Sequence, residues 1–134
     1  MKSSRIFIVD KNPIHRNLIR YNLESNKFTN VHVFPSGEEC LYRMEHKIYP
    51  DLLIASFFTG NSTGFDFLRS ILEISPFTLV IYFDKFEDPQ LPQRLIEAGA
   101  HDFVGKTTDP DAGISALLKN INYLLRETAL VNLQ

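Results

Sequence analysis

Five short apolar segments recur along this chain, and their regular alternation with segments of another periodicity limits the folds that it can adopt. Most of the apolar segments are bounded by Pro, Gly, Asn or Asp, which are residues that end strands and form turns. Short apolar runs of this kind predict β-strands. The predicted strands are residues 6–9, 31–34, 52–55, 79–83 and 101–104.

The intervening segments carry the signals of amphipathic helices. Asn12 and Pro13 predict a helix start, and Ser36 with Glu39 has the spacing of a capping box. Gly99 follows a later helical pattern and can end it as a left-handed cap. The apolar residues of the first helix share one face by their spacing, and they are Ile14, Leu18 and Tyr21.

Strand and helix patterns therefore alternate five times, which predicts the α/β class. Residues 52–55 are apolar at every position, as expected of a parallel strand that helices cover on both faces. Because crossovers between parallel strands are right-handed, the prediction is a doubly wound five-stranded parallel sheet. A common strand order for such a sheet is the flavodoxin-like 2-1-3-4-5.

Ligands of doubly wound sheets bind at the carboxyl ends of the strands. In this chain Asp10 and Lys11 follow the first predicted strand, and Ser56 follows the third. Asp84 follows the fourth and Lys106 the fifth. These five residues are the candidate site.

The same segments resemble the receiver domains of response regulators. Residues 6–13 resemble the opening receiver strand, in which two adjacent acidic residues precede an Asn-Pro helix start. Residues 50–65 resemble the third strand and its loop, where the phosphorylated aspartate stands six residues after a proline and eight before a glycine. Ser56 occupies that position. Residues 99–106 resemble the fifth strand, which ends in the receiver's lysine, and Asp84 stands 22 positions before Lys106, where the family keeps a threonine or serine.

The resemblance implies what each position does in the family and where this chain departs from it. In receivers the two acidic residues and the acceptor aspartate hold magnesium, while the lysine and the switch hydroxyl contact the phosphate. Here Lys11 replaces one metal-binding carboxylate, Ser56 replaces the nucleophile and Asp84 replaces the hydroxyl. Only Asp10 and Lys106 match the family pattern. The resemblance therefore implies a degenerate phosphorylation site, with no catalytic residue.

The chemistry of these residues predicts neither a metal nor another cofactor. One carboxylate beside the ammonium of Lys11 is a poor magnesium site. A serine hydroxyl needs a neighbouring base to become a nucleophile, and Asp84 is a candidate for that base at Ser56. The favoured alternative is that Asp10 and Asp84 pair with Lys11 and Lys106, because partly buried charges require partners.

Three aromatic residues near this edge are further candidates. Phe103 stands at the family's aromatic switch position, three residues before the lysine, and its lack of a hydroxyl favours permanent burial. Phe57 and Phe58 directly follow the acceptor position. They are either lids of the pocket or contacts for a partner.

Charge and hydropathy exclude several functions. The formal net charge is −2 and the 14 lysines and arginines are scattered, so binding of nucleic acid by this domain is not expected. No apolar run approaches the ~18–20 residues of a membrane span, and no signal-peptide pattern precedes the first strand. A cytoplasmic location is the expectation. The single Cys40 cannot form an internal disulfide and is interpreted as a buried small apolar residue.

The 134 residues fit one domain. Residues 1–126 are predicted to form the receiver-like domain, and residues 127–134 a C-terminal extension of the last helix or the start of a linker.

The leading functional hypothesis is an atypical receiver domain that acts as a phosphorylation-independent protein-interaction module and is not an enzyme. By resemblance, its signalling or output partner would bind through helix four, strand five and helix five, and a homodimer is possible. The alternatives are a phosphorelay receiver that is still phosphorylated on a non-standard residue, and a small-molecule sensor that uses the vacated pocket.

Overall fold

The computed structural model describes residues 2–58, 64–85 and 87–132, which form a five-stranded parallel sheet flanked by five helices. The strand order is β2-β1-β3-β4-β5, as predicted. The strands are β1 (Ile6–Val9), β2 (Val31–Phe34), β3 (Leu52–Ala55), β4 (Leu79–Asp84) and β5 (Asp102–Gly105). The helices are α1 (Pro13–Ser25), α2 (Gly37–Glu45), α3 (Gly64–Ile74), α4 (Leu91–Glu97) and α5 (Pro110–Asn132).

The first three strands have the bounds that the sequence predicts, and the last two differ by one residue. β4 includes Asp84 because this residue is paired with Gly105 of β5. The same pairing moves β5 one position along the chain, so that His101 precedes it. Asp84 and Gly105 thus extend the two strands at their carboxyl ends, where apolar periodicity gives no signal.

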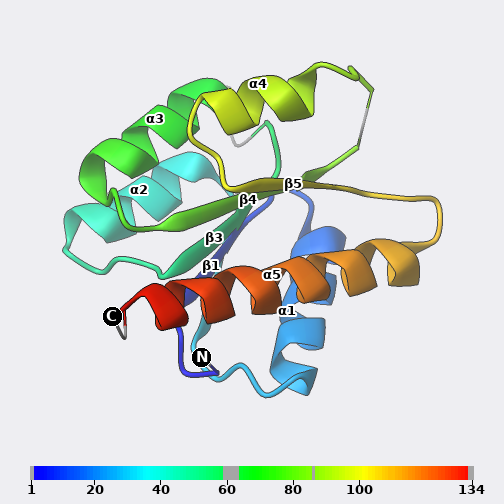
Figure 1. The fold of residues 1–134 in the computed structure, drawn as a ribbon, viewed down its shortest axis with the longest axis horizontal. Coiled ribbons are helices and arrows are strands. Elements are labelled where there is room, and N and C mark those ends of the chain that lie inside the picture. Colours follow the sequence, from blue (N-terminus) through cyan, green and yellow to red (C-terminus); the bar gives the residue numbers. More distant parts are fainter. Residues whose placement is uncertain (1, 59–63, 86, 133–134) are drawn as a thin grey trace.

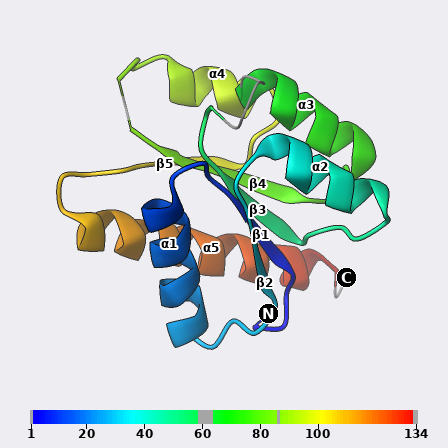
Figure 2. The ribbon, with the colours of Figure 1, turned by 180° about the vertical axis from the view of Figure 1, so that it is seen from behind.

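Helices cover both faces of the sheet. Figures 1 and 2 show α1 and α5 on one face and α2, α3 and α4 on the other. The strand residues alternate between two buried clusters: Ile8 and Ile54 pack with α1 and α5, whereas Phe7 and Leu53 pack with α2, α3 and α4. This two-sided burial explains why the strands are apolar at successive positions.

The side of α1 that faces the core agrees only in part with the one that the sequence pattern suggests, because Leu18 packs against the core but its two companions do not. Ile19 and Leu23 are buried against the sheet. Ile14 and Tyr21 are 75% and 70% exposed. Two apolar stripes overlap on this helix, and only packing against β1 and α5 decides which of them is buried.

The start and stop signals of the helices work as predicted. The side chain of Asn12 accepts hydrogen bonds from the backbone N–H groups of Ile14 and His15, and that of Ser36 accepts one from Glu39. Gly99 has a φ of 118° directly after α4, in a region that favours glycine. These local interactions fix where α1, α2 and α4 meet the edges of the sheet.

α5 runs without interruption to Asn132 and so crosses the predicted boundary at residue 126. Its 23 residues make it the longest helix in the described part of the chain. Neither α5 nor another helix of that part has the length and apolar character of a membrane span. The division between residues 1–126 and 127–134 stays a prediction, and Leu133 and Gln134 lie outside the described residues.

Two glycine-to-alanine changes test this backbone. Gly99 has a positive φ, and a Cβ added there would lie 2.7 Å from Leu72 Cδ1. Gly99→Ala should therefore lower the unfolding free energy by about 1–3 kcal/mol. At Gly113, inside α5, the new Cβ would meet its nearest neighbours at 3.6 Å, so Gly113→Ala should stabilise by about 0.5–1 kcal/mol. Urea denaturation measures both, and equal effects of the two changes would contradict this account.

Candidate functional site

The carboxyl ends of the strands bring the five candidate residues into one pocket. Asp10, Lys11, Ser56, Asp84 and Lys106 all line a depression of about 240 Å³ at this edge of the sheet. They come from the ends of β1, β3, β4 and β5, which converge here because the strands are parallel. The sheet topology thus brings the five predicted site residues together.

An ion pair between Asp10 and Lys106 lies at the centre of the pocket. Lys106 Nζ donates to Asp10 Oδ2 at 3.1 Å, and the side chains are only 14% and 6% exposed. The other carboxylate oxygen of Asp10 accepts the backbone N–H of Asn12 at 2.9 Å. The prediction that Asp10 is neutralised by a lysine is confirmed for this pair.

Two residues of α1 also contact this ion pair, although no sequence pattern singled them out. Lys106 Nζ lies 2.9 Å from His15 Nδ1, which accepts a hydrogen bond when the imidazole is neutral. Arg16 donates to the backbone carbonyl of Asp10 at 2.8 Å. A usable signal was present, because the Asn12-Pro13 start places the first turn of α1 directly above the end of β1.

The predicted second ion pair, between Asp84 and Lys11, is wrong. Asp84 Oδ2 accepts the backbone N–H of Phe57 at 2.7 Å, and Asp84 Oδ1 accepts that of Lys85 at 2.8 Å. Lys11 is exposed, and within residues 2–58, 64–85 and 87–132 it makes no ion pair. The carboxylate is satisfied by backbone donors, so the lysine can stay in water at little cost.

Ser56 is buried at the base of the pocket. Its backbone N–H donates to Val9 at 3.0 Å, and its hydroxyl donates to the carbonyl of Phe58 at 3.3 Å. The hydroxyl proton therefore points to a carbonyl, which is not a base that can remove it. Among the described residues, Asp84 makes no hydrogen bond to the serine hydroxyl.

The donor set of the pocket is poorly suited to magnesium. Both carboxylate oxygens of Asp10 are engaged, and so are both oxygens of Asp84. An ammonium group occupies the side of Asp10 where a cation would bind. Within the described ranges there is no group of three or more His, Cys, Asp or Glu side chains that could hold a metal.

The aromatic candidates occupy different environments. Phe103 is half-buried in β5 and packs against the cluster beneath α4, so the expected complete burial is not observed. Phe57 packs edge-on against Phe58 and Phe65, and the tight approach of Gly64 to its ring leaves no room for a side chain there. Phe58 is 58% exposed at the rim of the pocket.

The other titratable candidates are structural. Cys40 is fully buried, as expected, and burial raises the pKa of its thiol to about 12. His101 Nδ1 accepts the backbone N–H of Val80 at 3.0 Å, and desolvation lowers the pKa of this imidazole. Both groups therefore stay uncharged at neutral pH and carry no chemistry for the pocket.

Residues 6–118 match the family model of the response regulator receiver domain. The chain belongs to this family. A curated relative supports this assignment. The chain is 30% identical over 108 residues to protein-glutamate methylesterase/protein-glutamine glutaminase 3 of Geobacter sulfurreducens, and the match covers 81% of this chain and 29% of that protein. The chain spans less than half the length of the curated relatives that it matches.

Solved receiver structures have the same fold. The chemotaxis response regulator CheY4 of Vibrio cholerae superposes with a TM-score of 0.74 at 20% identity, over 87% of this chain and 97% of that one. The receiver domain of Francisella response regulator 1452 gives 0.78 at 19% identity, over 93% and 98%. By family, this chain is thus a receiver domain of a two-component response regulator.

The ion pair makes a quantitative prediction for this receiver. Lys106→Met would leave the buried carboxylate of Asp10 without its partner, and we expect it to lower the unfolding free energy by about 3–5 kcal/mol. The double variant with Asp10→Asn should recover part of this loss, because no buried charge then remains. Lys119→Met on the exposed side of α5 is the matched control, with an expected change within about 0.5 kcal/mol. A loss at Lys106 no larger than that control would contradict the structural role of the pair.

Proposed function

We propose that this receiver domain is a phosphorylation-independent protein-interaction module. The observation that carries the proposal is the buried serine, Ser56, at the acceptor position that the resemblance assigns, with its hydroxyl bonded to a backbone carbonyl. In this proposal the pocket is a fixed structural element, and signalling depends on what the surface binds. The domain is not an enzyme and uses neither metal nor cofactor.

The orientation of Ser56 supports this proposal over phosphorylation of a non-standard residue. A serine attacks a phosphoryl donor only when a base accepts its proton. The hydroxyl of Ser56 donates to a main-chain carbonyl instead. Asp84 lies where the family has a phosphate-binding hydroxyl, and its negative charge would repel a phosphoryl group.

We propose the surface formed by α4, β5 and α5 as the binding site for a signalling or output protein, or for a second copy of the domain. β5 is an edge strand, with β4 as its neighbour in the sheet. Asp102 of β5 accepts a hydrogen bond from Asn120 of α5 at 2.6 Å, which holds the two elements together. Ile96 of α4 is 39% exposed beside this strand and gives the surface an apolar contact.

The proposal places the domain in the cytoplasm and without a nucleic-acid ligand of its own. Family membership supports the first point, since receiver domains serve intracellular signalling. The balanced and scattered charges support the second.

The direct test is exposure to magnesium and beryllium trifluoride, which mimics an acyl phosphate on a receiver aspartate. We expect the backbone amide NMR signals of Ser56, Asp84, Phe103 and Lys106 to stay unmoved. The control variant Lys11→Asp/Ser56→Asp/Asp84→Thr restores the family's residues and should show shifts at these positions. Shifts in the unmodified domain would overturn the proposal.

The surface proposal has a separate test in the oligomeric state. Light scattering after size-exclusion chromatography should show a dimer whose population rises with protein concentration. Ile96→Asp should shift it to monomer, because burying the new carboxylate in the interface is costly. Phe77→Asp is the control, since Phe77 is 92% exposed and outside these three elements. A monomer at all concentrations, or equal effects of both changes, would exclude the homodimer and favour a different protein partner.

A further inference from the structure

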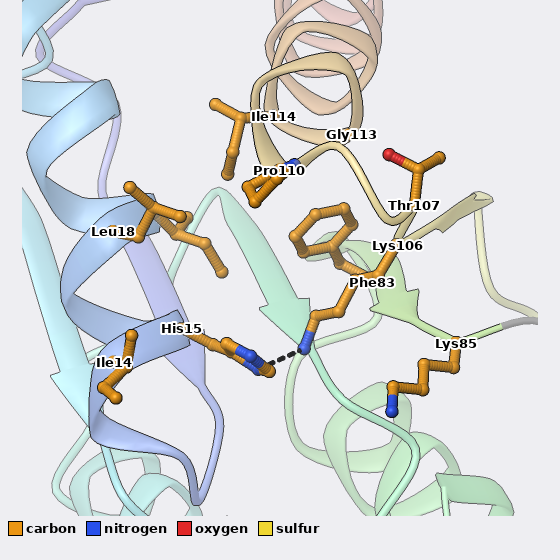
Figure 3. A pocket seen from close by; sticks show the side chains of 11 residues that line it. Ile14, His15, Leu18, Phe83, Lys85, Lys106, Thr107, Pro110, Gly113 and Ile114 are labelled. Atoms are coloured by element: carbon orange, nitrogen blue, oxygen red, sulfur yellow. Dashed lines mark hydrogen bonds between the residues drawn. The ribbon is translucent and has the colours of Figure 1, made fainter.

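A second cavity lies beside the pocket, between α1 and α5. Its volume is about 260 Å³, and its walls are mainly apolar. Figure 3 shows Leu18 on α1, Ile114 on α5 and the ring of Phe83 between the two helices.

Basic groups gather at one end of this cavity. Figure 3 shows Lys106, Lys85 and the imidazole of His15 at the end away from Ile114. The same three residues also line the neighbouring pocket, so the cavity and the pocket adjoin at this point. Lys85 is exposed and makes no ion pair with a residue of the described ranges.

The wall of the cavity includes a glycine, where a methyl group would fit in ordinary van der Waals contact. Gly113 forms part of the wall, and a Cβ there would meet Phe83 Cζ and the backbone nitrogen of Thr107 only at 3.6 Å. Ile14 lines the cavity and is 75% exposed, so the apolar wall continues to the surface. The opening is thus apolar as well as the interior.

The size of the cavity limits what it can hold. An apolar cavity of about 150 Å³ binds benzene, whereas sites for drug-sized ligands begin at roughly 300 Å³. A volume of about 260 Å³ fits a body of several carbon atoms. Binding such a body would remove apolar side chains of α1 and α5 from water.

The charged residues of the adjoining pocket determine which polar group a ligand can place there. Three lysines (11, 85 and 106) and two aspartates (10 and 84) line the adjoining pocket, so the lysines outnumber the aspartates by one when His15 is neutral. A single negative charge matches this excess, and a cation would be repelled. A dianionic phosphate would exceed it and would approach two carboxylates.

We propose that the cavity between α1 and α5 binds a small carboxylic acid, with its carboxylate at Lys85 and Lys106 and its apolar body between Leu18, Phe83 and Ile114. This ligand site goes beyond the proposed interaction function and does not depend on it. The bonds to Asp10 and to a neutral His15 use two N–H groups of the Lys106 ammonium, which has three. The third can therefore bind a ligand carboxylate without breaking the ion pair.

The test is a titration of the domain with sodium hexanoate, followed by the methyl NMR signals of Ile14, Leu18 and Ile114. 1-Hexanol has the same apolar body without the charge, hexylamine hydrochloride has the opposite charge, and sodium acetate lacks the apolar body. Hexanoate should move these signals with a Kd at least about fivefold below that of hexanol. Acetate and hexylamine should leave them in place.

Two variants make the result specific to this site. Lys85→Met keeps the length of an exposed side chain, and it should weaken hexanoate binding about two- to fivefold while leaving hexanol binding unchanged. Lys119→Met is the control with no expected effect. Leu18→Phe should weaken both ligands by filling the cavity, and its melting temperature shows whether it folds.

Two outcomes would overturn the inference. The first is that hexanoate up to about 10 mM, a concentration that detects even millimolar binding, moves none of the three methyl signals. The second is that hexanol and hexanoate bind equally in both the unmodified domain and Lys85→Met.

Discussion

The ion pair between Asp10 and Lys106 connects the ends of two strands that are not neighbours in the sheet. β1 and β5 are separated by β3 and β4, so this bond spans the carboxyl edge. Each buried charge would be costly without the other, because desolvation of a lone ion costs several kcal/mol. The backbone N–H of Asn12 and the ring of His15 complete the environment of the pair. The turn into α1 and the end of β5 are therefore held in one arrangement.

The charged residues at this edge lie outside the buried core of the domain. Lys11 and Lys85 face water, so they place positive charge at the pocket without a desolvation cost. The carboxylate of Asp84 is held by two backbone donors and acts as a connection between β4 and the segment after β3. None of these three residues belongs to the buried clusters on either face of the sheet. The charges at this edge can thus vary without disturbing the core that holds the fold together.

α5 links the two surfaces to which we assign binding. It forms one wall of the cavity with α1, and it also belongs to the proposed partner surface with α4 and β5. A carboxylic acid in the cavity would influence partner binding only if two arrangements of α5 differ in affinity for it. The cavity wall formed by α1 and α5 is where such a difference would arise.

The sequence alone determined the class of fold, the strand order and the membership of the pocket. Apolar runs and helix caps depend on neighbours a few residues away, and the parallel topology then brings Asp10, Ser56 and Lys106 to one edge. Tertiary structure alone decided which stripe of α1 is buried, because periodicity identifies faces but not the element that covers them. It also decided the partners: Asp84 bonds to backbone groups, and His15 meets a lysine 91 residues away in the sequence. Contacts between side chains far apart in the chain depend on the packing of whole elements, which no local pattern records.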